Sequence, residues 1–490
     1  MSLKIDRTSK LCIRDQIRQQ MSNRILSGLQ IEGSKLISVR KLAKEHAISP
    51  VTVMKAYELL EQDGLIYRIH GKGSFVRFRT KTKEQDTTTQ TNPYSWQESH
   101  KDYLNRVQFS NPIRIPSFEN GYDLSNASIN PNLLPTEKII STFSETLRRD
   151  IPILSEYGQP EGDPEFRQAL SNYFKRIGLK TNYDQIIVTN GGQQGLHLVA
   201  STFIGKNDVV FVEAPTYPGA IDIFTSRGAR IIPIPMDENG LKVDELYALC
   251  DKYKPKLIYT IPCFNNPTGY CLSKQRKKIL LDLAESYDFI IVEDDAWGEL
   301  NYDDCHRIAL KSLDRTGRVI FIKGFSKVIG PTYRLGAIVA EGSFLHRLAL
   351  NKSNSDLGSP LLIQRLLMPF FSSNNIDTYI DELRKKLKAK LMLVDRILQQ
   401  HAPPQLRWTL PKGGLNIWLK MPRGYSSDRL FIDYLQEEKI SILPGSMFFT
   451  DNNMSNCFRI TFSYLDDVDL QFAVKRLCEC VTAFVDRSNN

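Results

Sequence analysis

Lys327 has the sequence surroundings of a lysine that does covalent chemistry. In the 490-residue chain it lies within residues 321–336, where apolar residues precede and follow it, and Arg334 stands seven positions later. Burial among apolar groups lowers the pKa of a lysine, and the neutral amine can attack a carbonyl carbon to form a Schiff base. Arg334 offers a planar, permanently charged group that suits a phosphate. A Ser-Lys pair by itself more often only ends a strand, so the other motifs of the chain must decide.

Five motifs in a fixed order provide that context. They are Gly191-Gly192-Gln193-Gln194, Asn265–Gly269, Glu293-Asp294-Asp295, Ser326-Lys327 with Arg334-Leu335-Gly336, and Phe458-Arg459-Ile460. In this order they resemble the motifs of fold-type I pyridoxal-phosphate aminotransferases, and the resemblance covers most of residues 116–490. It implies an α/β fold with a large domain, built on a mixed and mostly parallel sheet, and a small domain. It also implies pyridoxal 5'-phosphate as the cofactor, held by Lys327 as an aldimine.

The same resemblance implies a role for each motif. Gly191, Gly192 and Gln193 open a helix behind a short strand, where free amides and the helix dipole favour a phosphate. Asp294 ends a strand and would keep a pyridine nitrogen protonated, which makes the ring an electron sink. Arg459 would pair with the carboxylate of a substrate or effector. The remaining cofactor contacts would be Asn266 at the ring oxygen, Tyr217 stacked on the ring, Arg334 at the phosphate, and Tyr157 from the second subunit of a homodimer.

Two positions depart from the aminotransferase pattern. Trp297 stands where a tyrosine is common three residues after the aspartate, so an indole without a phenol joins the cofactor-binding residues. Gly324 stands where a serine or threonine often binds the phosphate, so phosphate binding depends more on Arg334. Both departures predict that transamination is weakened.

The first 80 residues form a basic module. They hold 15 Lys and Arg residues against 7 Asp and Glu residues, so a net +8 of the chain's formal +9 lies there. Such an uneven charge favours a polyanion as partner, although an ordinary basic domain would share it. The apolar spacing from Ile13 to Ile25 predicts a packing helix. Ser38 and Ser49 would cap two short helices joined by a tight turn, which is a helix-turn-helix.

The sequence of this module resembles the winged-helix DNA-binding domain of GntR-type regulators. The resemblance runs from the opening helix through residues 38–44 and 48–67 to the wing at Gly71–Val76. Ile37 and Pro50 stand where that family often has proline and arginine, which leaves base readout at the start of the recognition helix open. The residues expected to contact double-stranded DNA are Arg40, Thr52, Lys55 and Lys72, because cations neutralise phosphates and a Gly-flanked lysine can enter a narrow groove.

The composition argues against a membrane protein, a secreted protein and a metal-binding protein, and it indicates a linker. Residues 79–115 form a polar linker with few aliphatic residues, as expected for a flexible tether. No apolar run approaches the roughly 20 residues that a membrane span needs, and the charged start lacks a signal-peptide core, so a cytoplasmic protein is expected. The eight cysteines are scattered without zinc-site spacing, so no metal is expected.

The combination resembles the MocR/GabR subgroup of GntR-type transcriptional regulators. It predicts a DNA-binding domain at residues 1–78, a linker at 79–115 and an aminotransferase-like effector domain at 116–490. The resemblance implies a regulator whose effector domain senses pyridoxal phosphate or an amino compound through aldimine formation, which would change the state of the DNA-binding module. An active amino-acid aminotransferase is the alternative, because the reactive lysine, the acid and both arginines are all present. The effector, the operator and the sign of regulation stay open.

Overall fold

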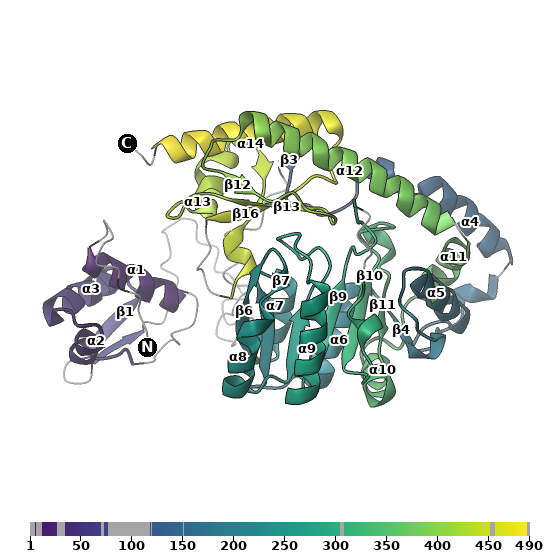
Figure 1. Ribbon diagram of the computed structural model, residues 1–490, viewed down its shortest axis with the longest axis horizontal. Helices are drawn as coiled ribbons and strands as arrows, with labels where there is room; N and C mark the ends of the chain where they lie inside the picture. Colours follow the sequence, from purple (N-terminus) through teal and green to yellow (C-terminus); the bar gives the residue numbers. More distant parts are fainter. Residues whose placement is uncertain are drawn as a thin grey trace, which may run out of the picture. The chain divides into compact units, whose positions relative to one another are not determined.

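The chain separates into two compact units, Met1–Pro112 and Ile113–Asn490, and each is described here by itself (Figure 1). The computed structural model describes residues 5, 12–26, 35–69, 73–76, 118, 120–149, 151–303, 308–373, 375–450 and 456–487. The domain limits predicted near residues 78 and 115 fall outside these ranges and stay predictions. Among the described helices, none combines the length and the apolar character that crossing a membrane requires.

The first unit is a helix-turn-helix followed by a two-stranded wing. Its elements are α1 (Ile13–Leu26), α2 (Val39–His46), α3 (Pro50–Gln62), β1 (Ile66–Ile69) and β2 (Gly73–Val76), and the two strands are antiparallel. The predicted caps are confirmed, since Ser38 accepts a hydrogen bond from the Lys41 amide and Ser49 accepts one from the Val51 amide. Ala47 between α2 and α3 adopts a left-handed conformation (φ 51°), which makes the turn tight. The three helices and the wing bury a core of their own around Tyr57.

The second unit is built on an eight-stranded sheet with the strand order β4-β11-β10-β9-β8-β5-β6-β7. Strands β11 and β7 run antiparallel to their neighbours. The five adjacent strands β6, β5, β8, β9 and β10 run parallel to one another. The strands are β4 (Ile186–Thr189), β5 (Val209–Ala214), β6 (Arg230–Asp237), β7 (Gly240–Leu241), β8 (Leu257–Thr260), β9 (Ile290–Asp295), β10 (Val319–Gly324) and β11 (Gly336–Val339). The sheet is mixed and mostly parallel, as predicted.

Helices cover both faces of this sheet, so most of its strands are apolar on both sides. One face packs against α6, α7 and α10, and the other packs against α8 and α9. The helices of the unit are α4 (Thr136–Arg149), α5 (Pro164–Arg176), α6 (Gly192–Phe203), α7 (Pro218–Ser226), α8 (Leu246–Tyr253), α9 (Lys274–Tyr287), α10 (Gly342–Asp356), α11 (Leu361–Ser372), α12 (Asn375–His401), α13 (Ser427–Leu430) and α14 (Asp467–Arg487). Short helical turns occur at residues 131–133, 151–154, 183–185, 243–245, 311–313, 331–333, 431–435 and 445–448.

A smaller antiparallel sheet forms a second layer of the same unit. Its order is β12 (Arg407–Trp408), β13 (Asn416–Lys420), β16 (Cys457–Thr461) and β15 (Leu443–Pro444), and α12 and α14 pack together on it (Figure 1). The pair β3 (Tyr122–Asp123) and β14 (Ile440–Ser441) joins the start of the unit to this layer. The Thr461 amide also donates to the Leu124 carbonyl oxygen. The segment after β3 is thereby held beside β16, where the site lies.

Candidate functional site

A cavity of about 550 Å³ lies where the parallel strands of the large sheet reach their carboxyl ends. The residues after β4, β5, β8, β9 and β10 form one wall, which is where open α/β sheets commonly bind ligands. The opposite wall comes from the segment after β3, from β15 and from β16. The cavity brings together the predicted residues Gly192, Gln193, Tyr217, Asn266, Asp294, Trp297, Lys327, Arg334 and Arg459.

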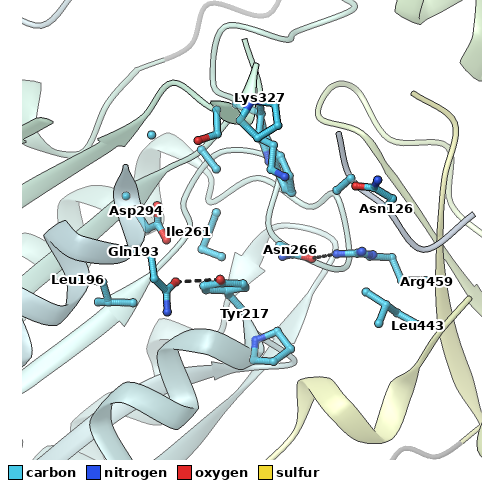
Figure 2. A pocket seen from close by; sticks show the side chains of 18 of the residues that line it. Asn126, Gln193, Leu196, Tyr217, Ile261, Asn266, Asp294, Lys327, Leu443 and Arg459 are labelled. Carbon is cyan, nitrogen blue, oxygen red and sulfur yellow. Dashed lines mark hydrogen bonds between the residues drawn. The ribbon is translucent and has the colours of Figure 1, made fainter. Parts of the chain in front are cut away.

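Lys327, the lysine predicted to react with the cofactor, faces this cavity. Lys327 and Tyr217 approach from opposite sides of it, with Asp294 and Gln193 at one end and Arg459 at the other (Figure 2). Burial, together with the positive charges of Arg459 and Arg334, lowers the pKa of Lys327 to about 8. A substantial fraction of the amine is therefore neutral near pH 8, which is the form that attacks a carbonyl carbon.

The start of α6 and the side chain of Arg334 form an anion-binding corner. The Arg334 Nη2 atom donates to the Asn190 carbonyl oxygen at 3.0 Å. Gly191, which precedes α6 and has φ 85°, does not line the cavity itself. A Cβ atom there would lie 2.9 Å from Arg334 Nη2, so glycine allows the guanidinium to approach the helix start. Backbone amides at the helix start and a guanidinium make this corner suitable for a phosphate.

A partly buried polar network holds the corner in place. Gln194 accepts from the Asn190 amide at 2.7 Å and donates through Nε2 to Asp356 at 2.6 Å. Lys352 Nζ pairs with the same Asp356 carboxylate at 2.7 Å. Sequence reasoning missed Lys352 and Asp356, because they lie at the end of α10 and no local pattern connects them to the glycine motif.

Asp294 forms the acidic end of the cavity with a tyrosine that the sequence did not suggest. Tyr259 of β8 donates its hydroxyl to Asp294 Oδ2 at 2.6 Å. Burial raises the pKa of Asp294 to about 6, and the Tyr259 hydrogen bond and the charge of Lys323 oppose that rise. All four residues of β8 are buried, so the sequence of this strand predicts only that Tyr259 is buried. A carboxyl group in this position can hold a protonated ring nitrogen.

Beneath the acid lies a buried ionic cluster. Lys323 is fully buried on β10 beside Asp295 of β9, and its Nζ atom bonds both Asp295, at 3.4 Å, and Glu299. The Tyr173 hydroxyl donates to the other oxygen of Glu299. Buried charges persist when they are paired in this way. The pairing occupies the Lys323 amine, which distinguishes it from Lys327.

The aromatic wall opposite Lys327 is fixed by its neighbours. The Tyr217 hydroxyl donates to Gln193 Oε1 at 2.8 Å, and burial raises the pKa of Tyr217 to about 12, so the phenol stays protonated. A Cβ atom on Gly219 would lie 2.7 Å from the Tyr217 ring, so glycine lets the ring lie flat against its own loop. The ring is placed to stack on a planar ligand.

The loop that carries Asn266 depends on Glu213, which sequence reasoning also missed. Glu213 is buried at the end of β5 and accepts from Thr260 Oγ1 at 2.6 Å, the Ile261 amide at 2.9 Å and Asn265 Nδ2 at 2.8 Å. Burial raises the pKa of Glu213 to about 7, and these three donors oppose the rise. The two asparagines of the motif Asn265–Gly269 thus have different contacts: Asn265 bonds Glu213 and fixes the loop, and Asn266 lines the cavity.

Arg459 is a buried cation at the far end of the cavity. Its side chain is 5% exposed, and burial lowers its pKa to about 9. Nη1 donates to Asn266 Oδ1 at 3.0 Å and Nη2 donates to the Ser125 carbonyl oxygen, whereas Nε has no acceptor among the described residues. A buried guanidinium with an unused donor suits a ligand carboxylate.

Two of the predicted cofactor contacts, those of Trp297 and Tyr157, differ from the others. Trp297 lines the cavity, but its Nε1–H donates to the Phe264 carbonyl oxygen at 2.6 Å, so the indole offers a ring face and not a hydrogen bond to a ligand. Tyr157 is 91% exposed and does not line the cavity. Its predicted role needs a second copy of the chain and stays a prediction.

Three of the four residues predicted to contact DNA lie on α2 and α3. Arg40 is exposed in the first turn of α2, Lys55 is exposed on α3, and Thr52 of α3 is half-buried. Lys72 lies outside the described residues.

Comparison with known proteins assigns both units. Residues 123–477 match the family model of aminotransferase class I and II, and residues 13–76 match that of the bacterial regulatory proteins of the gntR family. Aromatic-amino-acid aminotransferase 1 of Thermococcus litoralis is 32% identical over 72% of this chain and 85% of its own length. An uncharacterized HTH-type transcriptional regulator of Bacillus subtilis, YisV, is 28% identical over 96% of both chains.

Solved structures agree with these assignments. The alpha-aminoadipate aminotransferase of Thermus thermophilus, complexed with N-(5'-phosphopyridoxyl)-L-leucine, has a TM-score of 0.73 at 28% identity and covers 80% of this chain and 99% of its own. The predicted fold class, a winged helix-turn-helix joined to a fold-type I aminotransferase unit, is confirmed.

Proposed function

The chain belongs to the aminotransferase class I and II family and joins it to a gntR-family DNA-binding domain, and from this premise we propose that it is a pyridoxal-phosphate-dependent transcriptional regulator. The observation that carries the proposal is the presence of both domains in one chain, an arrangement also supported by the regulator similar over 96% of both lengths. In this proposal the second unit senses the cofactor, an amino compound or both, and the first unit binds operator DNA. Such a regulator would act in the cytoplasm, as a homodimer.

The residues of the cavity fit pyridoxal 5'-phosphate. The start of α6 and Arg334 suit its phosphate, Tyr217 suits its ring, and buried Asp294 suits its ring nitrogen. When bound, the cofactor supplies an aldehyde that condenses reversibly with a primary amine, and a ring that withdraws electrons. Lys327 provides the resident amine, because its lowered pKa leaves it partly neutral near pH 8.

The far end of the cavity suits the carboxylate and an uncharged side chain of an amino compound. Arg459 would bind the carboxylate through its unused Nε donor. The described part of the wall around it carries no second charged side chain: polar Ser125 and Asn126 are joined there by apolar Ala127, Leu443, Met447 and Phe448. Among the described lining residues the charged groups are Asp294, Lys327, Arg334 and Arg459, and each already has a role. We therefore place amino acids with apolar side chains ahead of dicarboxylates as effectors.

An active aminotransferase is the second candidate, favoured by the 32% identity to an aromatic-amino-acid aminotransferase. The acid, the lysine and both arginines meet in one cavity, so the binding residues for that reaction are present. Trp297 argues against efficient turnover, because its only hydrogen-bond donor is used by the Phe264 carbonyl oxygen. Binding an amine requires fewer hydrogen-bond donors from these residues than the proton transfer at the α-carbon of the amine does.

Lys55→Ala tests the DNA-binding part of the proposal. Lys55 is exposed on α3, so we expect its loss to weaken binding of the full chain to all duplexes alike and to reduce the salt slope by about one. Gln62→Ala, at the exposed end of the same helix, is the matched control and should change neither quantity. Fluorescence anisotropy at several salt concentrations measures both. Equal operator binding by residues 111–490 alone would contradict the assignment of DNA binding to the first unit.

Gly324→Ser tests the phosphate corner. A Cβ atom on Gly324 would lie 3.7 Å from the Gly192 amide nitrogen, an ordinary contact, so a serine fits without displacing the backbone. Its hydroxyl adds a donor, and one hydrogen bond worth about 1 kcal/mol should tighten cofactor binding about fivefold. Gly191→Ala is the opposing variant, because its Cβ would meet Arg334 at 2.9 Å. Equilibrium dialysis with pyridoxal 5'-phosphate measures the affinities, and weaker binding by Gly324→Ser would contradict the placement of the phosphate.

A further inference from the structure

The recognition helix α3 exposes apolar side chains where a DNA reader usually exposes polar ones. Val51 is 52% exposed and Met54 is 42% exposed, and both lie on the same face as exposed Lys55. The opposite face of α3, which includes Val53 and Tyr57, is fully buried in the core of the first unit. The helix is therefore anchored on one side, and its first two turns present an apolar surface outward.

Few polar side chains on this helix could read base edges. The sequence of α3 is PVTVMKAYELLEQ, which contains no arginine or asparagine and has its glutamine at the last position. Its acids point to the wing, because Arg68 of β1 pairs with Glu58 at 3.9 Å and with Glu61 at 3.3 Å. Apart from Lys55, the first two turns thus lack the side chains that pair with guanine or adenine, which are arginine, lysine, asparagine and glutamine.

The charges around the apolar face favour DNA as the molecule that covers it. Helix α2, which precedes α3, exposes three cations, Arg40, Lys41 and Lys44. On α3 itself, exposed Lys55 directly follows Met54. Cations beside a helix that enters the major groove neutralise phosphates and position the helix. In the major groove, the apolar group that distinguishes one base pair from the others is the C5 methyl of thymine.

We propose that Val51 and Met54 read thymine methyl groups, so that operator sequence is specified in part by apolar contact. The inference rests on the proposed DNA-binding function and adds which bases the helix selects. Burying one methyl group is worth about 0.8 kcal/mol, so each contacted thymine should contribute about fourfold in affinity.

The test uses the full chain and a duplex selected by it from a random-sequence pool. Replacing thymine by deoxyuridine removes only the methyl group. Wild-type protein should bind the deoxyuridine duplex about fourfold more weakly for each contacted position. Val51→Ala and Met54→Ala should each lose part of that discrimination, and the double variant should bind both duplexes alike. Lys55→Ala is the matched control on the same face, and it should weaken binding to both duplexes equally.

Two outcomes would overturn the inference while leaving the proposed function intact. One is equal binding of the thymine and deoxyuridine duplexes by the wild-type protein. The other is a double variant that still distinguishes the two duplexes as the wild-type protein does. A change in oligomeric state of the double variant without DNA, together with unchanged discrimination, would show that the apolar face contacts protein instead. Failure to select any duplex would instead contradict the proposed function itself. Both side chains are exposed, so the variants should fold, and a thermal melt checks this.

Discussion

Lys327→Ala should abolish the covalent attachment of pyridoxal 5'-phosphate. The wild-type protein should show the visible absorption band of a lysine-bound cofactor and a borohydride-stable adduct, and the variant should show neither. The physical reason is that Lys327 combines access to the cavity with a pKa lowered to about 8. Absorbance spectra and mass spectrometry after borohydride reduction measure the effect.

The controls for this variant distinguish attachment from folding. Lys386→Ala, at an exposed position of α12, should keep both the band and the adduct. Buried Lys323 is the neighbouring amine, but its pairs with Glu299 and Asp295 hold it away from such chemistry. A reducible adduct that persists in Lys327→Ala would contradict the assignment.

Arg459→Ala should remove the response to amino acids while the cofactor spectrum is retained. Arg459 is buried, and we place its unused Nε donor at the ligand carboxylate. A hydrogen bond to a charged group is worth about 1.5–3 kcal/mol, so losing it should weaken amino-acid binding about 10-fold to 150-fold. The measurement is the amino-acid concentration that half-saturates the spectral change.

Two further measurements test whether the charge and the planar shape of the Arg459 side chain are both needed. Arg459→Lys keeps a charge but loses the planar guanidinium and its Nε donor, so its half-saturating amino-acid concentration should lie between those of the wild type and Arg459→Ala. The charge of Arg459 lowers the pKa of Lys327, so Arg459→Ala should raise that pKa and shift the pH dependence of cofactor attachment upward. An unchanged half-saturation in Arg459→Ala would show that the carboxylate lies elsewhere.

The sequence was most informative where one residue follows the end of one strand. Asp294 lies at the end of β9, and Asn266 and Lys327 lie in the loops that follow β8 and β10, so parallel strands bring these positions to one edge of the sheet. The same local logic predicted the caps Ser38 and Ser49. These features depend on a few neighbouring residues, so the sequence suffices for them.

Features that depend on distant segments were not predictable in this way. Tyr259 meets Asp294 only because β8 pairs with β9, and Asp356 meets the glycine corner only because α10 packs beside α6. The sequence predicts only that the indole of Trp297 is a cofactor-binding residue, and the fold adds that its N–H donates to the Phe264 carbonyl oxygen. The fold also leaves Val51 exposed, although its apolar type alone would predict a core position.

The central claim is that ligand binding in the second unit changes DNA binding, and one titration tests it most directly. DNA affinity of the cofactor-loaded full chain is measured against increasing leucine, phenylalanine or glutamate, with the cofactor absorbance followed in the same samples. We expect an apolar amino acid to change both signals over the same concentration range, with DNA affinity altered by about 5-fold to 150-fold. Turnover with a keto acid should stay far below the ~10 s⁻¹ median of dedicated enzymes. Turnover near that median, with DNA affinity unchanged by every amino acid, would contradict the regulator and establish the aminotransferase.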